Sequence, residues 1–75
     1  MRSSIYERYV ARDTDPATIL EMSQDQIENQ IEDYAREDAL GNNPDATEAE
    51  IGQYREQAAH EIMLEAQRLV DARNE

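Results

Sequence analysis

The chain contains no cysteine, no lysine, no phenylalanine and no tryptophan, and only two glycines and two prolines in 75 residues. Without cysteine there is neither a disulfide framework nor thiolate chemistry, which is typical of proteins in a reducing compartment. Gly41 and Gly52 stand far apart, so there is no glycine-rich loop to hold a nucleotide phosphate. These absences leave no sequence signature of a disulfide-stabilised protein, a thiol enzyme or a nucleotide-binding protein.

Catalytic and metal-binding motifs are also missing. With one histidine and with serines at predicted helix starts, the chain offers no nucleophile paired with a base and an orienting group. His60 has Glu56 one turn before it and Glu61 beside it, but a single histidine is a weak zinc or iron signature. We therefore expect no enzyme activity and no catalytic, cofactor or metal site.

The segment Asp13-Thr14-Asp15 begins like a calcium-binding loop. Such a loop needs glycine at its sixth position and a bidentate glutamate at its twelfth. This chain has Thr18 and Gln24 there, so the segment is interpreted as a connection between helices.

Long hydrophobic runs are absent. Residues 1–14 lack the apolar run of a signal peptide, and no stretch approaches the roughly 20 apolar residues of a membrane span. The sequence therefore predicts a soluble cytoplasmic protein, in the host cytoplasm if it is encoded by a phage.

What the sequence has in excess is negative charge. Eighteen Asp and Glu stand against seven Arg, which gives a formal net charge of −11. Such a field attracts basic protein surfaces and repels nucleic acid and anionic lipid. We expect a protein partner with a basic surface, and no direct binding to nucleic acid or membrane.

The absence of lysine has three interpretations: codon bias in a GC-rich genome, adaptation to high salt, or selection for an acidic binding face. Six glutamines and four asparagines count against adaptation to high salt. Composition leaves the other two open.

Helix start signals divide the chain into four predicted helices, over about 4–12, 16–22, 24–40 and 47–73. Three starts resemble capping boxes and one places Asp15 before Pro16. The capping-box pairs are Ser4 with Glu7, Ser23 with Gln26, and Thr47 with Glu50. The chain could also continue as one helix through Ser23, and we favour a break there.

Apolar residues recur at helical spacing and nowhere alternate as in a strand. Ile27, Ile31 and Tyr34 define one stripe, and Ile51, Ile62 and other residues spaced by three and four define a second. Gly41 after the helix and Pro44 beyond it predict a helix end with a left-handed glycine. The prediction is a single all-α domain over 1–75, a small bundle in which helices 24–40 and 47–73 form an antiparallel hairpin and the two N-terminal helices pack across it.

Acidic residues also recur at helical spacing. Glu21, Asp25, Glu28 and Glu32 are spaced by four, three and four, and they rise about 16 Å along a helix, comparable with about five phosphates of one DNA strand. The negative area continues through Asp33, Glu37 and Asp38, and across the loop through Asp45, Glu48 and Glu50. Either this row imitates a phosphate backbone, or it is an ordinary solvated helix face.

A third feature is Leu64, which lies opposite the main apolar stripe of its helix. It is an isolated exposed residue, or it is covered by the N-terminal helix that carries Tyr6 and Tyr9, or it contacts another subunit. The tyrosines follow the apolar stripes and suit either core packing or interface anchoring.

Two hypotheses follow. The first is a small acidic inhibitor that occupies a basic, nucleic-acid-binding surface of a partner, in the manner of DNA mimics used by phages and mobile elements, for example in anti-CRISPR or anti-restriction roles. It rests on an analogy of composition. The alternative is a structural or assembly protein, a helical hairpin that dimerises or docks on a larger complex through Leu64, Tyr6 and Tyr9, with charge serving solubility.

Overall fold

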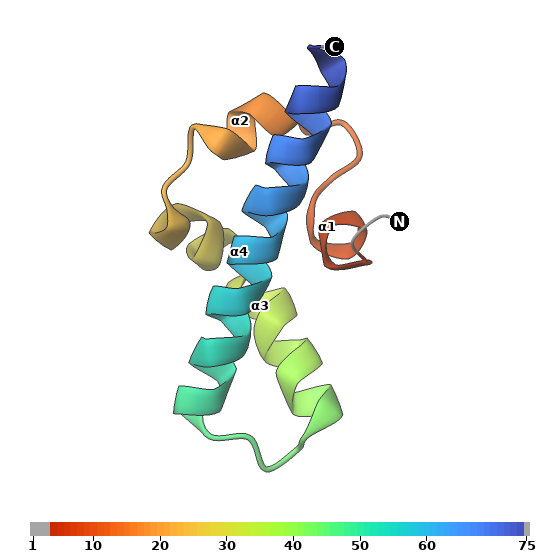
Figure 1. The fold of residues 1–75 in the computed structure, drawn as a ribbon. Coiled ribbons are helices and arrows are strands. Elements are labelled where there is room, and N and C mark those ends of the chain that lie inside the picture. Colours follow the sequence, from red (N-terminus) through yellow and green to blue (C-terminus); the bar gives the residue numbers. More distant parts are fainter. Residues whose placement is uncertain (1–3, 75) are drawn as a thin grey trace.

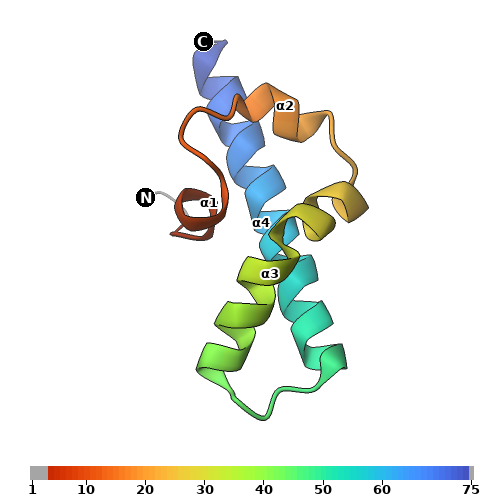
Figure 2. The same cartoon turned by 180° about the vertical axis from the view of Figure 1, so that it is seen from behind.

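The computed structural model describes residues 4–74 and shows an all-α fold, as the sequence predicts. Four helices follow one another: α1 (Ser4–Tyr9), α2 (Pro16–Leu20), α3 (Gln24–Asn42) and α4 (Glu48–Arg73). Within the described residues there is no strand. Helix α4 runs the length of the molecule, α3 folds back against it as an antiparallel hairpin, and α1 and α2 lie along its C-terminal half (Figure 1). Seen from behind, α3 crosses α4 obliquely (Figure 2).

The helix starts are fixed by local hydrogen bonds. At Ser23 and Thr47 both bonds of a capping box form, and the chain breaks between α2 and α3 at Ser23. Asp15 Oδ1 accepts from the Ala17 amide at 3.0 Å, and Pro16 occupies the first turn of α2. Helix α1 begins at Ser4 itself, so Ser4 is its first helical residue and not the N-cap that the sequence predicts.

The helix ends differ more from the predictions. Helices α1 and α2 end at Tyr9 and Leu20, three and two residues earlier than expected. The predicted left-handed cap at Gly41 is wrong, because Gly41 is helical and no described glycine has a positive φ. Helix α3 instead continues to Asn42 and stops where Asn43 adopts an extended backbone.

The core is built from isoleucine and alanine. Ile27, Ile31, Ala35 and Ala39 form one ridge of α3 at intervals of four. The buried apolar residues of α4 are Ile51, Ala58, Ala59, Ile62 and Ala66. Partly buried apolar residues of α1 and α2, among them Ile5, Tyr6 and Leu20, pack against this core.

Tyr34 lies outside this core, contrary to its place in the predicted stripe. Its side chain is 53% exposed, and its ring stacks on Tyr9 of α1 with centroids 5.6 Å apart. The deviation arises because the ridge of α3 drifts around the helix from Ile31 to Ala35, which leaves Tyr34 on the side facing α1.

Candidate protein-binding surface

The predicted acidic row does not form one open face, because two of its members are exposed and two are bound by an arginine of α4. Glu21 and Asp25 are exposed at the junction of α2 and α3. Glu28 and Glu32 lean toward α4, where Arg55 binds both, with Nε at 3.4 Å from Glu28 and Nη1 at 2.6 Å from Glu32. The expectation that Glu28 and Glu32 are part of the outer surface is therefore wrong. A helical wheel drawn for α3 alone does not include the arginine on the neighbouring helix.

The arginine contacts form a network across the hairpin. Arg36 binds Glu32 at 3.2 Å and Glu48 at 3.0 Å, so acids of α3 and of the start of α4 are linked. Hydrogen bonds from Arg55 and then Arg36 lower the pKa of Glu32, so its carboxylate stays ionised at neutral pH. The network holds the two arms of the hairpin in register.

Asp38, also predicted as part of the binding face, instead anchors α1. It accepts hydrogen bonds from the Tyr9 hydroxyl and from Arg8 Nη2, and its side chain is only 15% exposed. The Tyr9 bond and then the Arg8 bond lower the pKa of Asp38. Burial and the bond to Asp38 raise the pKa of the Tyr9 hydroxyl, which remains protonated as the donor.

Other acids of the hairpin point to solvent. Between residues 33 and 50, four acids are exposed and have no arginine partner in the described chain, and we call them the outer acids: Asp33, Glu37, Asp45 and Glu50. Asp25, Glu56 and Glu61, elsewhere on the hairpin, are also exposed and unpaired with arginine within residues 4–74. Glu50 also caps α4, because its carboxylate accepts from the Thr47 amide, and that bond lowers its pKa. Of the predicted site residues on α3, Asp25, Asp33 and Glu37 are thus exposed and have no arginine partner in the described chain.

The charge is distributed unevenly along the molecule. Residues 24–61, which we call the acidic hairpin, contain eleven Asp and Glu against two Arg and so account for −9 of the net −11. Outside the acidic hairpin lie Arg8, Arg12, Arg68 and Arg73; Arg68 and Arg73 pair with acids there, whereas Arg8 pairs with Asp38 of the hairpin. The net field of the protein therefore originates on the hairpin.

The predicted apolar interface is divided between two faces of α4. Tyr6 and Tyr9 are half-buried against the core, on the side of Ile62 and Ala66. Leu64 lies on the opposite side, is 58% exposed and is not covered by α1.

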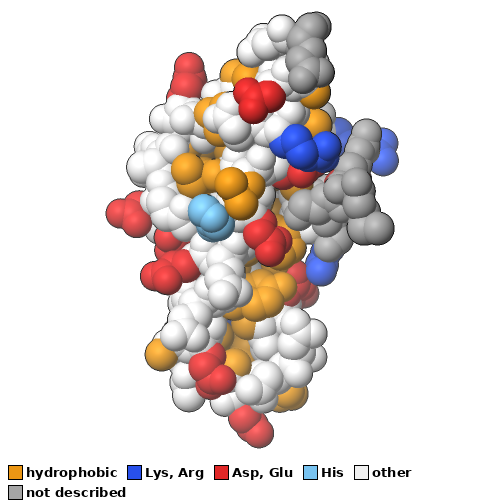
Figure 3. Space-filling view, in the orientation of Figure 1, with side chains coloured by type: hydrophobic (Ala, Val, Ile, Leu, Met, Phe, Trp, Pro, Cys, Tyr) orange, Lys and Arg blue, Asp and Glu red, His pale blue; other side chains and the backbone are white. Residues whose placement is uncertain are grey.

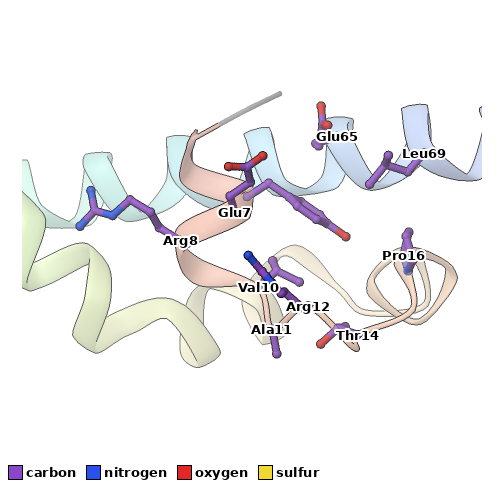
Figure 4. Close-up of a pocket in the computed structure, with 10 residues that line it drawn as sticks. Glu7, Arg8, Val10, Ala11, Arg12, Thr14, Pro16, Glu65 and Leu69 are labelled. Atoms are coloured by element: carbon purple, nitrogen blue, oxygen red, sulfur yellow. The ribbon is translucent and has the colours of Figure 1, made fainter. Parts of the chain in front are cut away.

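A pocket of about 540 Å³ lies between α1, the following loop and α4 (Figure 4). Tyr6, Val10 and Leu69 line it together with charged residues of both signs, including Glu65 and Arg12. In Figure 4, Arg8 extends away from the pocket toward α3. The lining includes no histidine, and the charges offer no single sign to a ligand.

Two further observations concern the part of the chain that the structure describes. Across residues 4–74, no group of three or more histidine, aspartate or glutamate side chains is arranged to hold a metal ion. None of the four described helices is long and apolar enough to cross a membrane.

Comparison with protein-family models, with curated proteins and with solved structures finds no match to this chain.

Sequence reasoning missed the bridging role of Arg55. A signal for it is present in the sequence: Arg55 lies about ten residues after the middle of the loop, and Glu32 lies on α3 one turn before the position at the same distance on the other side. In an antiparallel hairpin such positions face each other, so the arginines and glutamates could have been paired in advance.

Proposed function

We propose that this protein is a small acidic inhibitor, not an enzyme, which uses its hairpin to occupy a basic, nucleic-acid-binding surface of a partner protein. The observation that carries the proposal is the concentration of nine of the eleven net negative charges on residues 24–61. A field concentrated on one end orients the protein as it approaches a basic groove and speeds association. A DNA mimic carried by a phage or mobile element, with an anti-CRISPR or anti-restriction role, is the specific form of this proposal.

Rigid presentation of the carboxylates supports the proposal. Three of the outer acids, Asp33, Glu37 and Glu50, stand on helices whose starts are capped and which are joined by the Arg55 and Arg36 network, and Asp45 lies in the loop between those helices. Carboxylates held in place lose little conformational freedom when arginines or lysines of a partner bind them. Asp33 and Glu37, one turn apart on α3, are the residues that we expect to make direct contact.

The test begins with capture of partners from a bacterial lysate on the immobilised full chain, followed by washes of increasing salt. We expect to capture a nucleic-acid-handling protein that elutes at moderate salt. Added duplex DNA or RNA should displace that protein from the immobilised chain. Retention of nucleic acid itself, or of a partner insensitive to both salt and competitor, would contradict it.

A pair of double variants locates the surface. Asp33→Lys/Glu37→Lys reverses two charges on the hairpin, and Asp13→Lys/Glu21→Lys reverses two exposed charges outside it. Both change the net charge equally. We expect the first pair to slow association at least about tenfold and the second to change it much less. Equal effects would show that only net charge matters, and not this surface.

A further inference from the structure

The side of α4 that faces away from the core carries a regular stripe of exposed residues. Their spacing of four, three, four, three and four is that of the a and d positions of a heptad repeat. We call them the α4 outer stripe: Gln53, Gln57, His60, Leu64, Gln67 and Asp71. Leu64 lies in the C-terminal half of the stripe and exposes 58% of its surface.

The stripe differs from the rest of the surface in charge. Asp71 is its only residue with a formal charge at neutral pH, in a chain with a net charge of −11. Two copies of such a chain repel each other, so they can approach closely only where carboxylates are few. Figure 3 shows this face of α4, with the histidine beside hydrophobic side chains.

We propose that the α4 outer stripe is a homodimer interface, in which α4 of a second copy packs antiparallel about a two-fold axis between Leu64 and Gln67. A two-fold axis makes the same patch contact itself. In this register Leu64 faces Gln67 of the second copy and His60 faces Asp71 of the second copy. Asp71 already accepts a hydrogen bond from Gln67 Nε2 of its own chain at 2.8 Å, and a ring N–H of His60 can donate to the same carboxylate as a second polar partner.

The flanks of the stripe select both the partner and the register. Glu61 and Arg68 lie on the same flank of the stripe. The antiparallel arrangement therefore brings Glu61 of one copy close to Arg68 of the second copy, and the two-fold axis repeats this pair. Arg68 binds Glu65 within its own chain but remains 56% exposed, so donors are left for a second carboxylate. Centring the axis between His60 and Leu64 would instead place Glu61 against Glu61 of the second copy.

The interface has one large apolar side chain per copy at its centre, and the other flank carries Met63 and Val70, both half-buried, and the exposed Glu56. Solvent-exposed ion pairs contribute little free energy, so they fix the register more than the affinity. The dimer is therefore weak and depends on protein concentration.

Sedimentation equilibrium of the full chain, from about 10 µM to about 1 mM, tests the interface. We expect the mass to rise toward the dimer with concentration, and to rise further with NaCl because screening reduces repulsion between the copies. That salt response is opposite to the one expected for the basic partner, so the two proposals can fail separately. A monomer at every concentration and salt overturns the dimer.

Two variants that add one negative charge localise the contact. Leu64→Glu, at the stripe, should weaken dimerisation at least tenfold, whereas Asn29→Glu, on the exposed face of α3, should leave it within about twofold of the unchanged protein. Circular dichroism confirms that both variants remain helical. Unchanged dimerisation of Leu64→Glu overturns the proposal.

The register has its own test, because the chain has no cysteine. Leu64→Cys and Gln67→Cys proteins, mixed under oxidising conditions, should cross-link to each other faster than either cross-links to itself, since the antiparallel arrangement places these positions opposite each other. Faster self-linking of Leu64→Cys would indicate pairing about another axis and overturn this register.

Discussion

At the scale of single residues, most arginines of this chain hold elements together. Arg8 joins α1 to α3 through Asp38, and Arg73 Nη1 binds Asp15 Oδ1 at 2.7 Å, joining the end of α4 to the start of α2. Arg55 joins the two arms of the hairpin. Because so few cations are available, the acids that they leave unpaired define the surface that a basic partner meets.

Asp38 gives a residue-scale prediction about acid. Its pKa lies below the usual 3.8 because Tyr9 and Arg8 bind the charged form, so its contribution to stability is present above that pH and is lost as pH falls through the lower folded value. We expect Asp38→Asn to lower the free energy of unfolding at pH 7 and to lower it less at about pH 2.5, since the contribution declines as the pH falls below 3.8 toward the folded pKa.

Urea unfolding at both pH values measures this difference. Asp33→Asn is the matched control, because Asp33 is exposed and has no arginine partner in the described chain. The same loss of stability for both variants, or a loss for Asp38→Asn that does not depend on pH, would contradict the role of Asp38 as the anchor of α1.

At the scale of elements, one face of α4 is buried in the core and the opposite face is exposed to solvent. Ile62 is 1% exposed and is the largest fully buried side chain, whereas Leu64, two residues later, is largely open to solvent. Ile62→Ala should lower the free energy of unfolding by about 2–5 kcal/mol through the cavity that it leaves. Leu64→Ala should change it by less than about 0.5 kcal/mol.

Thermal or urea unfolding at low protein concentration, where the chain is monomeric, makes this comparison. A large effect of Leu64→Ala in the monomer would mean that Leu64 packs within its own chain. The two substitutions remove apolar atoms from opposite sides of one helix, so each serves as the control for the other.

Features of the helices that depend on neighbouring residues in the sequence could be predicted, and features that depend on contacts between helices could not. The starts at Ser23 and Thr47 depend on side chains within three residues, and both were predicted from the sequence. The exposure of Tyr34 and the pairing of Arg55 depend on which helix lies alongside, and helical periodicity within one segment does not contain that information. Glu28 and Glu32 were assigned to the binding surface for the same reason.

At the scale of the whole molecule, self-repulsion of the acidic hairpin opposes folding, and salt should relieve it. We expect the melting temperature to rise as NaCl is added, because screening weakens repulsion among eleven Asp and Glu more than it weakens the few ion pairs with Arg36 and Arg55. A gain of about 1 kcal/mol raises the melting temperature of a domain of this size by about 4–8 °C.

Thermal unfolding followed by circular dichroism, below the concentration range of the dimer, measures this response. Asp33→Asn/Glu37→Asn removes two of the outer acids, so it should melt higher in low salt and gain less from added NaCl. A flat or falling response in the unchanged protein would mean that the Arg36 and Arg55 network outweighs the repulsion. The unpaired carboxylates of the hairpin would then place little strain on the fold, and neutralisation of their charge by a basic partner would not stabilise it.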